Sequence, residues 1–314
     1  MRDVFAAAAG WQRKGRSFAV ATLCGVRNAA PAPLGASMAV TDRGEIAGDI
    51  GAGCYESQIV EAAMLTARDG AVRVLEIDLS SDDPLEGSSG CGGFLEVAVW
   101  RPPAEFATVA EAIAAGAREV VYSLAFARGG KPDEFRLSVP ARRTIAVVGG
   151  TALAQELASI AARVDFRTVV VDPRPAFATT ERLRAVAEIV VAWPDEALPA
   201  LLNATTPLVV ISHDPKLDLP ALRAGLASDA PYIGLLGSRR AQKARRAALR
   251  ADGFDAAALA RIHGPAGLDL GGESMAETAV SIVAEIIAAG RARSGSPLLQ
   301  LAGAIHNDVI AEAR

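Results

Sequence analysis

The sequence predicts an α/β chain in two parts: an N-terminal mixed α+β domain, followed by a domain built on a parallel sheet. In residues 143–172, a run of β-branched and apolar residues ends at Gly149, an alanine-rich helical segment follows, and a second such run ends at Asp172. Strand and helix patterns continue to alternate after Asp172. A polar stretch at 128–140, with Gly-Gly and two prolines, is typical of a domain boundary. We therefore expect domains at 1–128 and 142–314, joined by a linker at 129–141.

Residues 143–172 form the pattern of a βαβ unit, which makes the second domain Rossmann-like. Gly149 then lies where the first strand ends, at the edge of the sheet where such folds bind ligands. A dinucleotide turn requires three small residues, and the chain has Gly149, Thr151 and Ala154. Asp172 stands where a ribose-binding acid is expected, but Thr151 places a β-branched side chain where the phosphate comes closest. A nucleotide-type fold with another ligand, or with none, therefore stays open.

The composition is that of a globular protein. Of the 314 residues, 51% are hydrophobic, which suffices for large cores, and the net charge of −4 gives no indication of nucleic-acid or membrane-surface binding. No apolar run is long enough to span a bilayer and the first residues lack a signal-peptide pattern, so we expect a cytoplasmic protein. Three cysteines without zinc-type spacing do not make a disulfide framework, so any functional cysteine acts as a thiol.

The N-terminal domain is expected to place two cysteines in glycine-rich turns. Cys54, between Gly53 and Glu56, precedes a helical pattern, and a helix N-terminus favours both a thiolate and a bound anion. Cys91 and Gly92 stand at the end of a loop, 80–93, that leads into a strand. The alternatives are a buried cysteine whose glycines serve the turn, and a flexible loop tip. The remaining pattern predicts helices at 1–14 and 105–117 and strands at 18–25, 38–41, 45–50, 71–77, 94–100 and 119–127.

In the second domain, a buried strand at 207–212 is followed by His213 and Asp214 at the ligand-binding edge. A histidine there can donate a hydrogen bond, act as a base or pair with an anion. The alternative is that Asp214 caps a helix and His213 is merely exposed. His263 lies in a further glycine-rich segment, 261–272. Other strands are expected at 188–192 and 232–236, and a helix at 195–203.

Two helices near the C-terminus have distinct faces. The helix that begins at Ser238 carries basic residues along one side, which serve either as a solvated face or as a contact for an acidic partner or phosphate; they are Arg239, Lys243, Arg246 and Arg250. A capping box at Ser274 and Glu277 begins the last helix. Its apolar stripe is expected to contain Val280, Val283 and Ile287.

Together these motifs make the chain resemble the XdhC/CoxI family over nearly its whole length. The residues that carry the resemblance are Gly35-Ala36 with Met38, Gly53 to Glu56, Cys91-Gly92-Gly93, Ser212 to Pro215, Tyr232 to Arg239 and Ile262 to Asp269. The chain departs from the family at two places, because Thr151 replaces the second glycine of the Rossmann turn, and the usual Gly-Gly-Cys-Val-Glu reads Ala-Gly-Cys-Tyr-Glu at 52–56.

The resemblance implies an accessory protein of molybdenum hydroxylases, such as xanthine dehydrogenase or carbon monoxide dehydrogenase, rather than an enzyme. Such proteins are expected to bind the molybdenum cofactor (molybdopterin), protect it while a cysteine desulfurase sulfurates it, and pass it to the apo-hydroxylase. The cofactor-binding residues expected on this basis are Gly53, Cys54, Glu56, Cys91, Gly92, Gly149, Thr151, Asp172, His213, Asp214 and His263, with Cys54 and Cys91 as candidate metal ligands. The alanine-rich helical composition also favours a homodimer.

Two other functions stay open on the sequence alone. The first is an NAD(P)-dependent oxidoreductase with Asp172 on the ribose and His213 as acid or base, although Thr151 argues against it. The second is a ligand-sensing or partner-docking module that uses the basic helix face and performs no chemistry.

Overall fold

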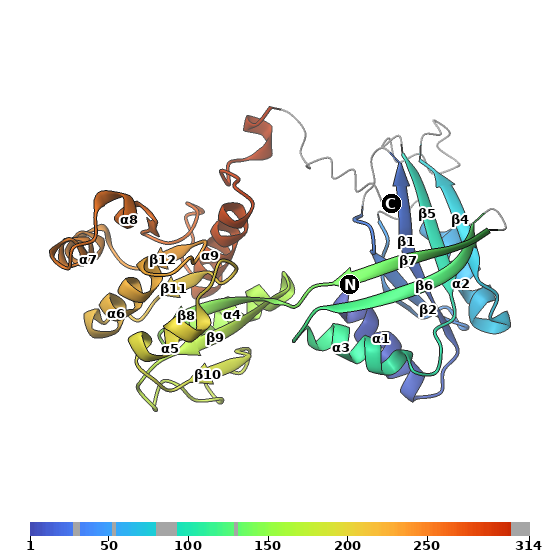
Figure 1. Cartoon of the computed structure of the whole chain (residues 1–314), viewed down its shortest axis with the longest axis horizontal. Helices are drawn as coiled ribbons and strands as arrows, with labels where there is room; N and C mark the ends of the chain where they lie inside the picture. The colour runs from blue at the N-terminus through green and yellow to red at the C-terminus, as the bar shows by residue number, and fades with distance from the viewer. Residues whose placement is uncertain (28–31, 52–54, 80–92, 129–130, 303–314) are drawn as a thin grey trace. The chain divides into compact units, whose positions relative to one another are not determined.

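The computed structural model describes residues 1–27, 32–51, 55–79, 93–128 and 131–302. The chain divides into two compact units, Met1–Arg142 and Arg143–Arg314 (Figure 1). Cys54, Gly53, Cys91 and Gly92 lie outside the described residues. None of the helices in the described ranges is long and apolar enough to cross a membrane.

The first unit is built on a five-stranded antiparallel sheet with the order β3-β2-β1-β5-β4. One face packs against α2, whose Ile59, Ala63 and Ala67 are buried at helical spacing. The other face packs against α1 and α3 around Phe106. Cys24 is buried in this second core. The elements are α1 (Arg2–Arg13), β1 (Phe18–Arg27), β2 (Ser37–Thr41), β3 (Ile46–Gly48), α2 (Glu56–Asp69), β4 (Arg73–Asp78), β5 (Phe94–Trp100) and α3 (Phe106–Ala115).

The segment expected to be a linker is instead part of a long two-stranded ribbon (Figure 1). Strands β6 (Val120–Arg128) and β7 (Lys131–Val139) pair along their whole length, from Val120 opposite Val139 to Arg128 opposite Lys131. Leu137 and Val139 are buried in the core with α1 and α3, whereas the alternate residues Arg136 and Ser138 are exposed. The polar residues that suggested a linker are therefore the solvent face of a strand with a period of two.

The second unit is a six-stranded parallel sheet with the order β10-β9-β8-β11-β12-β13. Numbered from β8, this is the order 3-2-1-4-5-6 of dinucleotide-type folds, which confirms the Rossmann-like prediction. Helices α4 and α9 cover one face, and α5, α6, α7 and α8 cover the other. The strands are β8 (Arg143–Val148), β9 (Phe166–Val171), β10 (Glu188–Val190), β11 (Leu208–Val210), β12 (Ile233–Leu235) and β13 (Ile262–His263). The helices are α4 (Ala152–Arg163), α5 (Pro194–Leu201), α6 (Pro215–Leu226), α7 (Arg239–Ala251), α8 (Ala256–Ala260) and α9 (Met275–Gly290), and a short 3-10 helix, η1 (Leu298–Gln300), follows.

The capping box of α9 is present, and of the three residues expected in its apolar stripe, Val283 is buried and Ile287 packs against the core, whereas Val280 is wrong. Val280 is exposed, and the buried apolar positions are Ala279, Ile282, Val283 and Ile286. This set follows the spacing i, i+3, i+4, i+7 of a helix that packs on a sheet. Glu285, which directly precedes the buried Ile286, is half-buried and is hydrogen-bonded to Tyr232 and His263.

Candidate functional site

The edge at which the parallel strands end, here called the carboxyl edge, brings several of the expected residues together. Strand β8 has β9 on one side and β11 on the other, so the strand order reverses there, which is where such sheets bind ligands. Gly149 follows β8 with φ of +117°, and a Cβ atom at this position would lie 2.9 Å from the Cα atom of Ser212, which follows β11. Glycine is required because the two chains approach too closely for a side chain.

Asp172 follows β9 and is completely buried beneath this turn. Its carboxylate accepts hydrogen bonds from the Gly150 N–H at 2.8 Å, from the Arg174 N–H at 3.0 Å, and from the Arg174 guanidinium at 2.9 and 2.7 Å. Burial alone would raise the pKa of Asp172, but the hydrogen bonds from Arg174 and Gly150 hold it below its usual value. Both carboxylate oxygens are therefore engaged within the chain, and Asp172 supports the turn.

The segment that begins at Arg174 lies directly over the same turn. A Cβ atom at Gly150 would lie 2.5 Å from the carbonyl oxygen of Phe177, so the two backbones are in contact there. The Arg174 guanidinium stacks on the Phe177 ring at 4.0 Å. Sequence reasoning missed both residues, although the arginine two positions after Asp172 was a signal that could have been read.

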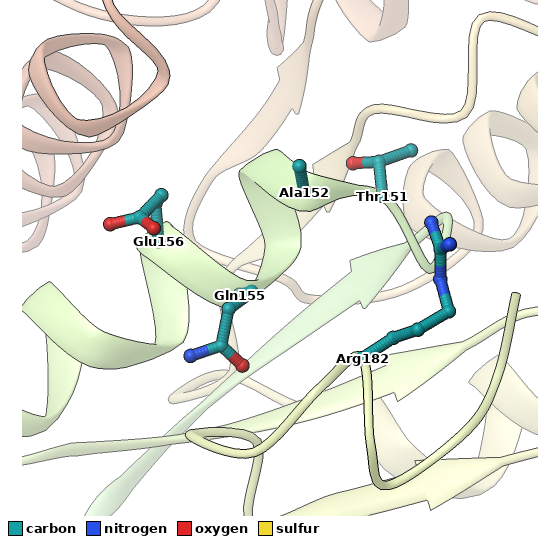
Figure 2. Close-up of a pocket in the computed structure, with 5 residues that line it drawn as sticks. All are labelled: Thr151, Ala152, Gln155, Glu156 and Arg182. Carbon is teal, nitrogen blue, oxygen red and sulfur yellow. The ribbon is translucent and has the colours of Figure 1, made fainter.

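A hollow of about 280 Å³ opens at the N-terminus of α4 (Figure 2). It is lined by Thr151, Ala152, Gln155, Glu156 and Arg182, and Figure 2 shows the Arg182 side chain extending toward Thr151 from a separate segment. Thr151 precedes the helix, but its hydroxyl does not cap it, and the buried Oγ1 atom has no partner among the described residues. The N-terminus of α4, the Thr151 hydroxyl and the Arg182 guanidinium suit an anionic group such as a phosphate, whereas the Glu156 carboxylate in the same lining opposes one.

Asp214 has the structural role that the sequence left open. Its Oδ1 atom accepts a hydrogen bond of 2.9 Å from the Lys216 N–H and caps α6. His213, in the left-handed region at φ +59°, places its Nδ1 atom 3.9 Å from where a Cβ atom of Gly237 would be. The ring therefore lies beside the turn that leads from β12 into α7.

A buried ion pair fixes α6 and α7 behind this edge. The Asp218 carboxylate accepts hydrogen bonds from the Arg245 guanidinium, 2.6 Å from its Nε, and from the Ser212 hydroxyl at 2.5 Å. Both charged side chains are almost fully buried, with 1% of Asp218 and 8% of Arg245 exposed. Ser212 thereby connects the carboxyl edge to the ion pair.

The expected basic face of α7 is only partly available to a partner. Arg246 is half-buried and donates hydrogen bonds to the carbonyl oxygens of Leu259 at 2.6 Å and Ile262 at 2.7 Å. Arg239, Lys243 and Arg250 are exposed. Arg246 therefore ties α7 to α8 and β13, which argues against its role in docking.

His263 lies apart from the turn at Gly149, on the last strand of the sheet. Its Nδ1 atom is 3.0 Å from Oε1 of Glu285 on α9, and Oε2 of Glu285 accepts hydrogen bonds from the Tyr232 hydroxyl at 2.6 Å and the Gly267 N–H at 2.7 Å. Burial and the Glu285 carboxylate raise the pKa of Tyr232 far above its usual value. Sequence reasoning missed Glu285, because no local pattern links it to His263.

In the first unit, only one of the expected cofactor-binding residues can be placed. Glu56 is half-buried and is the first residue of α2, after Tyr55 at the N-cap position. Within the described ranges, no group of three or more His, Cys, Asp or Glu residues is arranged to hold a metal ion. The expectation that Cys54 and Cys91 are metal ligands therefore stays a prediction.

Comparison with known proteins relates both units to one group. Residues 145–286 match a family model described as the XdhC Rossmann domain, and residues 11–78 match the XdhC and CoxI family. The chain is 23% identical over 288 residues to the molybdenum cofactor insertion chaperone PaoD of Escherichia coli, covering 87% of this chain and 83% of PaoD. It is 30% identical over 132 residues to a Bacillus subtilis protein described as a probable subunit of xanthine dehydrogenase, covering 42% of this chain.

The chain spans less than half the length of two of these relatives, and a crystal structure with the same fold is known. The chain spans 38% of the Bacillus subtilis protein and 46% of the uncharacterised Escherichia coli protein YqeB, to which it is 23% identical over 285 residues. A crystal structure described as a xanthine dehydrogenase from Bacillus halodurans shares the fold, with a TM-score of 0.75 and 22% identity over 95% of this chain and 99% of that one. Because models for both units match, the chain belongs to the XdhC and CoxI family.

Proposed function

We propose that this protein is an accessory chaperone that binds the molybdenum cofactor, protects it during sulfuration and inserts it into a molybdenum hydroxylase such as xanthine dehydrogenase. The observation that carries the proposal is the similarity to a molybdenum cofactor insertion chaperone over 87% of this chain. We further propose that a cysteine desulfurase supplies the sulfur, and that the protein acts as a homodimer in the cytoplasm.

The hollow at the N-terminus of α4 supports the proposal chemically. Molybdopterin carries a phosphate, and the Thr151 hydroxyl, the first N–H groups of α4 and the Arg182 guanidinium are groups that bind phosphate. We propose that these residues hold the phosphate, with Gly149 and His213 lining the neighbouring part of the carboxyl edge. Cys54 and Cys91 would supply thiols for the metal or its sulfur.

The first experiment measures cofactor binding without any hydroxylase. The protein is incubated anaerobically with free molybdenum cofactor and passed through gel filtration, and molybdenum and pterin are quantified in the protein peak. We expect near-stoichiometric cofactor with the wild-type protein and loss of it with Cys54→Ser. Cys24→Ser is the matched control, because Cys24 is buried in the sheet core, where its thiol donates to the Glu96 carbonyl oxygen at 3.4 Å.

The second experiment measures transfer. Adding the loaded protein to apo-hydroxylase should restore hydroxylase activity, and adding a cysteine desulfurase during loading should increase that activity. Absence of cofactor from the wild-type peak, or loading without any transfer to the apoenzyme, would contradict the proposal.

The two other functions that the sequence left open find less support. Both oxygens of Asp172 are engaged by Gly150 and Arg174, and Phe177 lies against the turn, so a dinucleotide would need this segment to move. The partner-docking function has less support because Arg246, one of the basic residues that it would use, is hydrogen-bonded to backbone carbonyl oxygens of its own unit. We therefore propose neither function.

A further inference from the structure

Glu285 is a half-buried carboxylate that is hydrogen-bonded to three different groups. The Tyr232 hydroxyl and the Gly267 N–H both donate to Oε2, and the imidazole of His263 lies against Oε1. Only 18% of the Glu285 side chain is exposed. Burial would raise its pKa, but the bonds from His263, Tyr232 and Gly267 hold it below its usual value. Glu285 is therefore an ionised group that can only accept hydrogen bonds.

This arrangement fixes the tautomer of His263. Because a carboxylate oxygen has no proton to give, the contact at 3.0 Å requires that Nδ1 of His263 carry the hydrogen. In the neutral imidazole, Nε2 is then the acceptor. No described residue is hydrogen-bonded to Nε2, and 36% of the side chain is exposed.

The orientation of the ring is fixed as well. The Tyr232 ring lies 4.6 Å from the imidazole, centroid to centroid. Gly234 lies opposite His263 in the strand pairing. Its lack of a side chain makes room for the Tyr232 ring, since a Cβ atom at Gly234 would lie 2.8 Å from the Tyr232 hydroxyl oxygen. Tyr232 therefore contacts both the ring of His263 and the carboxylate that orients it.

We propose that Nε2 of His263 is a ligand-contacting hydrogen-bond acceptor, and that Glu285 and Tyr232 are positioning residues that hold it in that state. The same pairing of a carboxylate with one imidazole nitrogen orients the other nitrogen in many functional sites. Three groups hold the Glu285 carboxylate in place, while 36% of the His263 side chain is exposed, so the imidazole is oriented from behind and open to a ligand in front.

The class of ligand follows from the charge and the tautomer. An uncharged acceptor with a carboxylate behind it disfavours an anion and favours an N–H or O–H donor. A pterin ring, with its amide N–H and amino groups, has this chemistry, and its choice as the ligand rests on the proposed function. The site is thus distinct in chemistry from the hollow beside Arg182, which suits a phosphate.

The test reads the tautomer and the contact directly by nuclear magnetic resonance. Long-range ¹H–¹⁵N spectra of the labelled full chain are recorded at about pH 8, where an ordinary imidazole is neutral, and His263→Gln assigns the signals. We expect a protonated Nδ1 and an unprotonated Nε2, and a change of the Nε2 signal when 6-hydroxymethylpterin is added. Inorganic phosphate at equal concentration should leave the signal unchanged.

Variants separate positioning from folding. Glu285→Gln should give a mixture of tautomers and bind the pterin about tenfold more weakly, Tyr232→Phe should weaken binding less, and the exposed Glu61→Gln should change neither. A protonated Nε2 in the wild-type protein, or a response to phosphate and none to the pterin, would overturn the proposal. Because the pterin carries no metal or phosphate, failure here leaves cofactor loading and transfer to be judged separately.

Discussion

The carboxylate of Asp172 and the backbone N–H of Gly150, 22 positions apart, are joined by a hydrogen bond of 2.8 Å beneath the turn that follows β8. The same carboxylate binds the Arg174 guanidinium at 2.7 Å. These bonds outweigh burial and lower the pKa of Asp172 in the folded state. The position of the turn therefore depends on the charge of one buried side chain.

The stability that Asp172 contributes should consequently vary with pH. Its folded-state pKa lies below the unfolded value of about 3.9, so the stabilisation is fully present above that value and is lost as the pH falls through the folded pKa. At neutral pH, Asp172→Asn should lower the free energy of unfolding by about 1–3 kcal/mol, and the difference from wild type should shrink below about pH 4. Urea unfolding across this pH range measures both values. The exposed Asp229→Asn is the control, and a difference that persists unchanged in acid would refute the argument.

The ion pair of Asp218 and Arg245 leads to a second prediction, which compares the free energy of unfolding after removal of one charge with that after removal of both. Arg245→Met leaves a carboxylate that is 1% exposed without its cation, so the free energy of unfolding should fall by about 3–5 kcal/mol. Adding Asp218→Leu should recover much of that loss, because the uncompensated charge is then gone. Arg223→Met breaks the exposed pair with Asp252 and should cost at most about 1 kcal/mol. A double variant no more stable than Arg245→Met would contradict the buried-charge explanation.

The fold of the second unit could be predicted because its information is local. Each buried strand is a short apolar run, and Gly149 marks the end of β8 in the sequence itself. The first unit was harder, because β7 has no large apolar residue over 131–134 and alternates polar and apolar residues only over 134–139, so the segment becomes a strand only when it pairs with β6. The polar composition of this segment indicated a loop, whereas its alternation with a period of two indicated a strand.

The sequence could predict those residues of the candidate site that belong to a local motif, but not the contacts between side chains from different elements. Gly149, Thr151 and Asp172 follow from the turn, but the engagement of Asp172 by Arg174 depends on side-chain geometry. Glu285 reaches His263 from a helix 22 positions further along the chain, so no spacing rule could have joined them. Contacts between elements are therefore what sequence reasoning missed.

Charge reversal on α7 should separate a structural arginine from an exposed one. Arg246→Glu removes two hydrogen bonds to backbone carbonyls and places a carboxylate beside them, so the free energy of unfolding should fall by about 2–3 kcal/mol. Arg250→Glu, on the exposed side, should stay within about 0.5 kcal/mol of wild type. Thermal and urea unfolding measure both. Equal losses for the two variants would mean that the bonds to Leu259 and Ile262 contribute little.

Two threonines with buried hydroxyls allow the proposed phosphate site to be tested without disturbing the fold. Neither Oγ1 of Thr151 nor Oγ1 of Thr168 has a hydrogen-bond partner within the described part of the chain. Replacing either residue with valine keeps the side-chain shape and removes no hydrogen bond, so both variants should stay within about 1 kcal/mol of the wild-type free energy of unfolding. Thr168 is enclosed in β9, whereas Thr151 lines the hollow at α4.

If the Thr151 hydroxyl contacts the cofactor phosphate, Thr151→Val should bind the molybdenum cofactor about tenfold more weakly, the loss of one hydrogen bond to a charged group. Thr168→Val should bind it as wild type does, because its hydroxyl cannot reach the hollow. Titration of both variants with the cofactor, followed by pterin fluorescence, gives the two affinities. Equal, undiminished affinity for both variants would place the phosphate elsewhere than at the N-terminus of α4.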